Sequence, residues 1–78
     1  MVLMKIKIGK KYLHNTFAGV KVVSKIIEEE QPGIFMGQLV RKKDIASLKK
    51  AGVAYTGKEK LSSCVGVVYP FQVIREWK

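Results

Sequence analysis

The chain has 78 residues, of which 47% are hydrophobic, and its 15 Lys and Arg against 6 Asp and Glu give a net charge of +9. A chain of this length forms one domain that buries only about 60% of the surface its unfolded form exposes, which leaves little room for a deep catalytic pocket. The hydrophobic fraction also excludes a disordered protein. We therefore expect a single folded domain over residues 1–78.

The positive charge is concentrated outside one acidic run, because Glu28, Glu29 and Glu30 are half of the acidic residues. A surface of this sign attracts polyanions and the acidic faces of proteins. The alternative is a charged surface that only keeps the protein in solution. Arg41 and Arg75 are the only two arginines, and a surface dominated by Lys favours non-specific attraction over base readout.

The amino-terminal segment has a period of two in its hydrophobic residues, which predicts a half-buried strand from Val2 to Ile8 with a basic outer face. Gly9 interrupts this pattern, and the strand is expected to continue through residues 10–13 after a bend or a bulge. The polar segment that follows contains His14, which we interpret as a loop residue because the chain has no second histidine to complete a metal or acid–base site.

The next two segments are predicted to form a β-hairpin. Val20–Ile27 is rich in β-branched residues, and Ile34–Arg41 follows it after a turn at Pro32-Gly33. Gly37, in the middle of the second of these strands, indicates a bulge or the corner of a small barrel.

One short helix is expected, from Asp44 to Gly52. The Asp44 side chain is predicted to cap its first amides, and Lys49 and Lys50 suit the negative end of the helix dipole. Gly52 suits the left-handed residue that commonly ends a helix.

The carboxyl-terminal third contains three more apolar segments, at residues 53–55, 64–69 and 71–74, and Pro70 separates the last two. Cys64 is the only cysteine, so we expect a buried, inert thiol in a reducing compartment. The apolar amino-terminal run is too short for a signal peptide or a membrane span, and a cytoplasmic protein is predicted. The predicted core consists of Ile6, Ile8, Val20, Val22, Phe35, Leu39, Leu48, Val67 and Phe71.

Three segments carry a resemblance to a known architecture: residues 7–12 as an opening strand, residues 33–37 as a bent central strand, and residues 69–74 as a closing segment. In this order the chain resembles the SH3-like small barrels. The predicted fold is therefore mainly β, a small SH3-like barrel of five or six strands with one short helix. The helix lies where such barrels often have only a turn. The compact, Lys-rich sequence is also similar to small accessory proteins of bacteriophages.

The sequence offers no recognisable catalytic set. A serine or cysteine nucleophile would have to pair with His14, and the candidates are Ser24, Ser47, Ser62, Ser63 and Cys64, none within a nucleophile-elbow motif. The three consecutive Glu are expected to be solvated, and one Cys with one His is too few for a structural zinc site. We therefore predict a protein that is not an enzyme, with no cofactor, metal or small-molecule substrate.

A binding surface is predicted instead from two pairs and one trio of adjacent bases, which are Lys10, Lys11, Arg41, Lys42, Lys43, Lys49 and Lys50. Tyr12 and Tyr55 lie near these bases and are predicted to stack on nucleobases or to anchor a partner, unless the tyrosines only cover the core. Nucleic-acid binding through this Lys-rich surface is the predicted function. The alternative is a protein-interaction module or inhibitor that docks on an acidic protein surface, and no membrane partner is expected.

Overall fold

The computed structural model describes residues 5–78 and is mainly β, with 42% strand and 20% helix, as predicted. The five strands are β1 (Lys11–Asn15), β2 (Lys21–Gln31), β3 (Ile34–Leu39), β4 (Val65–Val68) and β5 (Val73–Trp77). The helix α1 (Lys42–Lys50) follows β3, and the 3-10 turns η1 (Leu61–Ser63) and η2 (Pro70–Gln72) precede β4 and β5.

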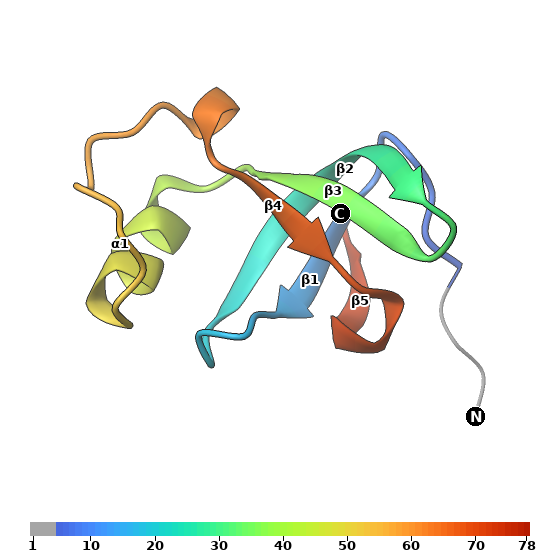
Figure 1. Cartoon of the computed structure of the whole chain (residues 1–78), viewed down its shortest axis with the longest axis horizontal. Helices are drawn as coiled ribbons and strands as arrows, with labels where there is room; N and C mark the ends of the chain where they lie inside the picture. Colours follow the sequence, from blue (N-terminus) through green and yellow to red (C-terminus); the bar gives the residue numbers. More distant parts are fainter. Residues whose placement is uncertain (1–4) are drawn as a thin grey trace.

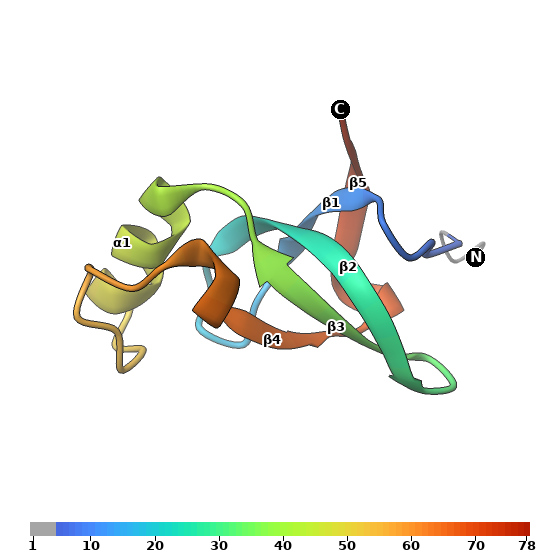
Figure 2. The same ribbon diagram turned by 90° about the horizontal axis from the view of Figure 1, so that it is seen from above.

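The strands form one antiparallel sheet in the order β4-β3-β2-β1-β5 (Figure 1). Within the described residues β4 and β5 are its two edges and do not pair with each other, so this sheet is not closed into a barrel. The long strand β2 forms its centre, and α1 lies beyond the end of β3, away from the β2–β3 turn (Figure 2). The extended segment after α1 returns the chain to β4.

The β2–β3 hairpin forms where it was predicted, but β2 continues through the acidic run to Gln31. The backbone of Glu28 and Glu29 pairs with β3 while their side chains stay exposed, and the register shifts on either side of this pair of residues. Gly33 has φ +80° and closes the tight turn, a conformation that glycine adopts without steric cost. The pairing register therefore depends on this turn as well as on the hydrophobic pattern.

The predicted first strand is wrong in the part that the structure describes. Residues 5–10 are outside the sheet's strands, and β1 begins only at Lys11, while the rest of the predicted strand lies outside the described residues. The segment is held instead by a few hydrogen bonds, from the Lys7 amide to the Tyr12 hydroxyl (2.9 Å), from the Gly9 amide to the Ile26 carbonyl (2.7 Å) and from the Ile26 amide to the Lys10 carbonyl (2.9 Å). A period of two in hydrophobicity does not by itself provide a neighbouring strand for the backbone to pair with.

The core forms two clusters. One joins the sheet to the helix and contains Val22, Leu39, Ile45, Leu48 and Cys64, and the other contains Tyr12, Ile26, Phe35 and Val68. The predicted core positions Ile8, Val67 and Phe71 are wrong, because their side chains are 61%, 43% and 60% exposed. Val67 faces outward since its neighbour Val68 faces inward, as alternation along a strand requires.

Helix α1 begins at Lys42, two residues before the predicted start, and Arg41 at its N-cap makes no side-chain capping hydrogen bond. The predicted capping role of Asp44 is therefore wrong. Gly52, with φ +101°, follows the helix end as expected. The apolar segment at residues 53–55 has no strand structure, and its Val53 and Tyr55 pack against the core cluster that joins the sheet to the helix. Over residues 5–78 no helix has the length and apolar character to cross a membrane.

Candidate functional site

The strand register gathers cations on the outer face of the sheet. Lys11 of β1 lies directly opposite Lys25 of β2 and opposite Trp77 of β5. Residues paired in this way share a face, and Arg75 shares it too because it is two residues from Trp77. Tyr12 and Ser24, one position along, point to the opposite face. The outer face of three strands therefore carries two lysines, one arginine and one tryptophan.

Arg41 joins this group from the beginning of α1. Its guanidinium carbon lies 5.0 Å from the centre of the Trp77 ring, and that of Arg75 lies 4.9 Å from the same centre. Both distances are within the range of a cation–π interaction, which is worth about 0.5–1 kcal/mol at exposed sites. We call Lys11, Lys25, Arg41 and Arg75, with Trp77 between them, the cationic face.

Asp44 fixes the orientation of Arg41. Its carboxylate accepts hydrogen bonds from Arg41 Nε (2.9 Å) and from an Arg41 terminal nitrogen (2.8 Å), and Oδ2 also accepts one from the Val23 amide (3.0 Å). The Asp44 side chain is only 3% exposed, whereas that of Arg41 is 23% exposed. The pair thus ties the start of α1 to β2 and leaves the remaining edge of the guanidinium beside Trp77.

Of the predicted surface bases, Lys11 and Arg41 are brought together at Trp77, while Lys42, Lys43, Lys49 and Lys50 are exposed on α1. Lys10 is exposed and pairs with Glu76 over 3.5 Å, a surface ion pair of the kind that contributes little. Nζ of Lys49 donates to the Thr56 carbonyl (3.0 Å).

The two tyrosines predicted to contact a partner lie elsewhere. Tyr12 is 1% exposed and packs in the core with Ile26 and Phe35, so its predicted role as a surface ring is wrong. Tyr55 is half-buried against the cluster that contains Cys64. Burial, followed by the proximity of Cys64 and Glu59, raises the pKa of the Tyr55 hydroxyl.

Sequence reasoning missed Lys25, Arg75 and Trp77 as members of one site. The alternation of Arg75 and Trp77 was visible, but only the pairing of β1 with both β2 and β5 shows that they face the same side as Lys11. These three residues are therefore identified as members of one site from the strand register.

A second surface feature consists of three aromatic side chains in edge-to-face contact, which we call the aromatic cluster. The ring centroids of Phe17 and Tyr69 are 5.9 Å apart, and those of Tyr69 and Phe71 are 5.4 Å apart. Phe17 is 81% exposed and Phe71 is 60% exposed. Both phenylalanines therefore lie outside the core.

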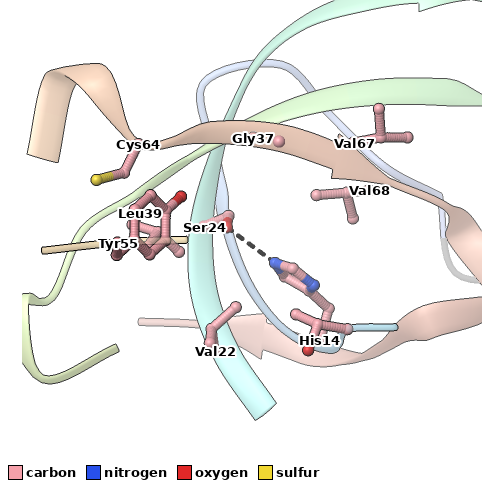
Figure 3. A pocket seen from close by; sticks show the side chains of 11 residues that line it. His14, Val22, Ser24, Gly37, Leu39, Tyr55, Cys64, Val67 and Val68 are labelled. Carbon is pink, nitrogen blue, oxygen red and sulfur yellow. Dashed lines mark hydrogen bonds between the residues drawn. The ribbon is translucent and has the colours of Figure 1, made fainter. Parts of the chain in front are cut away.

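A small pocket of about 80 Å³ opens on the inner face of the sheet, with His14, Ser24, Gly37 and Val68 on one side and Tyr55 and Cys64 on the other (Figure 3). His14 lies in β1 and is 3% exposed, so its interpretation as a loop residue is wrong.

The two polar groups at the base of this pocket satisfy each other. His14 Nδ1 is 2.9 Å from the Asn15 carbonyl, which can only accept, so Nδ1 carries the proton. Nε2 then accepts from the Ser24 hydroxyl at 2.8 Å. Burial lowers the pKa of His14 and keeps the imidazole neutral, although the Asn15 bond and Asp44 act in the opposite direction. The arrangement is a serine–histidine pair oriented by a backbone carbonyl, with both side chains buried.

In residues 5–78 no group of three or more His, Cys, Asp or Glu lies close enough together to hold a metal ion. Comparison of the chain with protein-family models, with curated proteins and with solved structures gives no match.

Proposed function

We propose that this chain is a small, non-catalytic nucleic-acid-binding protein that contacts the phosphate backbone through its cationic face. The observation that carries the proposal is the contact of two arginines, Arg41 and Arg75, with the Trp77 ring, beside the paired lysines of β1 and β2. The guanidinium groups of Arg41 and Arg75 each lie about 5 Å from one ring centre, so they are at most about 10 Å apart. Arg75, which makes no ion pair among the described residues, suits phosphate oxygens, because the planar guanidinium binds them in a bidentate manner.

The ion-pair pattern supports this assignment. Among the described residues the only ion pairs are Lys10–Glu76 and Arg41–Asp44, so Lys11, Lys25 and Arg75 have no carboxylate partner there. Unpaired cations beside each other repel, and a polyanion relieves that repulsion when it binds. The net charge of +9 adds long-range attraction, and Lys42 and Lys43 of α1 extend the positive region beyond Arg41.

Two finer assignments belong to the same proposal. The five-stranded antiparallel order with β2 at its centre, together with the 3-10 turn η2 before β5, supports a half-open barrel of the SH3-like class. A role as a bacteriophage accessory protein in the cytoplasm is supported by the small size, the basic charge and the single buried cysteine.

A protein-interaction module is the second candidate, and the edge strand β4 favours it. Val65 and Val67 are 38% and 43% exposed on a strand that pairs with β3 on one side only within residues 5–78. An extended segment of a partner can add to such an edge through main-chain hydrogen bonds.

The salt dependence of nucleic-acid binding tests the proposal. We expect the parent to bind a labelled oligonucleotide with an affinity that falls steeply with salt. K11Q/R75Q should lower the magnitude of the slope of log K against log salt by about 1.4–1.8, since each lost phosphate contact contributes about 0.7–0.9. The matched control K58Q/K60Q removes two exposed charges from the segment between α1 and η1 and should leave the slope near that of the parent. Equal slopes for the two variants, or no binding by the parent, would contradict the proposal.

A further inference from the structure

The aromatic cluster presents rings to solvent from two separate parts of the chain. Phe17 comes from the β1–β2 loop, whereas Tyr69 and Phe71 flank the Pro70 that begins η2. With Phe17 81% and Phe71 60% exposed, most of both rings lies in water instead of against the core. A contiguous group of exposed apolar rings on a small protein marks a surface that another molecule covers.

Hydrogen bonds brace both supporting segments. In the β1–β2 loop, the Thr16 hydroxyl donates to the Val20 carbonyl (2.7 Å) and accepts from the Val20 amide (3.2 Å). In η2, the Tyr69 amide donates to Gln72 Oε1 (3.2 Å) and the Gln72 amide donates to the Tyr69 carbonyl (2.9 Å). The backbone segments that carry the rings are therefore held in place before any partner binds, which lowers the entropy cost of binding.

The aromatic cluster is joined to the cationic face by one strand. Phe71 precedes Trp77 by six residues, which at about 3.3 Å per residue is at most about 20 Å, and Arg75 lies between them. At the other side of the cluster, the exposed Lys21 begins β2 directly after the loop that carries Phe17. Cations and exposed rings at this separation suit a ligand that carries both negative charge and flat apolar groups.

We infer that the aromatic cluster stacks against unpaired bases, so that the protein prefers single-stranded nucleic acid whose phosphates lie on the cationic face. This inference rests on the proposed function and specifies its ligand. Bases of a single strand expose their faces to aromatic side chains, and such stacking tolerates any sequence because every base has a π-face. In a duplex those faces are covered by neighbouring base pairs, so the aromatic cluster gains nothing there.

The test compares two probes and two double variants by fluorescence anisotropy. The probes are a labelled 12-nucleotide oligo(dT) and the same strand paired with oligo(dA). F17A/F71A removes the two exposed rings, and I8A/I27A removes two exposed apolar side chains outside the aromatic cluster, which are 61% and 39% exposed in the parent. Both variants should fold, because all four side chains are on the surface; circular dichroism checks this.

We expect the parent to bind oligo(dT) more tightly than the duplex, and F17A/F71A to lose about 10-fold or more of its affinity for oligo(dT). Its duplex affinity and its salt slope should equal those of the parent, since no cation is removed. I8A/I27A should match the parent on both probes.

Each contrary result has a distinct meaning. Parent-like binding of oligo(dT) by F17A/F71A, or a parent that prefers the duplex, would overturn the stacking inference while leaving binding by the cationic face intact. A parent that binds neither probe would refute the proposed function and this inference with it. The aromatic cluster would be assigned to protein recognition instead if F17A/F71A bound oligo(dT) as the parent does but lost a protein that the parent retains in a pull-down after nuclease treatment.

Discussion

Gly37 of β3 occupies a place where even a methyl group does not fit. A Cβ atom built on Gly37 would lie 2.8 Å from Ser24 Cβ and 2.8 Å from Val68 Cγ2. Ordinary contacts between such carbon atoms are about 3.5–4.0 Å, so β2 or β4 must move away by roughly 1 Å. Ser24 cannot shift freely, because its hydroxyl donates to the buried Nε2 of His14 at 2.8 Å.

We therefore expect G37A to lower the free energy of unfolding by about 1–3 kcal/mol, the usual cost of overpacking a filled interior. For a domain of this size each kcal/mol corresponds to about 4–8 °C, so the Tm should fall by roughly 5–20 °C. Equilibrium urea unfolding followed by circular dichroism measures the free energy, and a thermal scan measures the Tm.

Gly66 provides the matched control because it lies directly opposite Gly37 in the β3–β4 ladder. A Cβ on Gly66 meets nothing within 4 Å. G66A should be neutral or should stabilise the protein by up to about 1 kcal/mol, since alanine restricts the unfolded chain. If G37A proves as stable as G66A, the close approach of β2, β3 and β4 at this point is refuted.

Two further predictions concern buried polar groups. Burial lowers the pKa of His14 below 6.5, so the unfolded chain takes up a proton at a higher pH than the folded chain does. The contribution of the neutral His14 to the free energy of unfolding is therefore fully present above pH 6.5. Below that pH the free energy of unfolding falls, by up to about 1.4 kcal/mol per pH unit. Urea midpoints at pH 7.5 and 5.5 should show this loss in the parent and a smaller one in H14Q, and equal losses would exclude His14 as its source. D44N, which breaks the buried contact with Arg41, should lower the free energy of unfolding by about 3 kcal/mol. E76Q, which breaks an exposed ion pair, should lower it by less than about 1 kcal/mol. Urea unfolding that ranks the two carboxylates in the reverse order would contradict the structural role given to Asp44.

The parts of the fold that were predictable from sequence carry local signals. The β2–β3 turn has Pro32 and Gly33, Pro70 interrupts the last apolar run, and Gly52 follows the helix. Each residue acts through its own backbone dihedrals, so the effect is present before any tertiary contact forms. The helix start was misplaced because Asp44 uses its carboxylate for Arg41 and the Val23 amide, which are not local capping partners.

The candidate sites depended on which residues the fold brings opposite each other. The density of lysines predicted a basic surface, but Lys25 and Arg75 join Lys11 only through the β1–β2 and β1–β5 registers. Tyr12 was expected at that surface, and its position one residue from Lys11 turns it into the core instead.

The sequence by itself determined the positive charge, the strand-rich composition, the hairpin turn and the single short helix, because composition and local dihedral preferences are properties of neighbouring residues. Only the tertiary structure decided that Phe17 and Phe71 remain in solvent, that His14 is buried against Ser24, and that two arginines meet on Trp77. Those outcomes depend on which face of a strand is covered by a distant part of the chain. A hydrophobic pattern shows which residues favour burial. So small a domain can bury only some of them, and the tertiary structure determines which ones are buried.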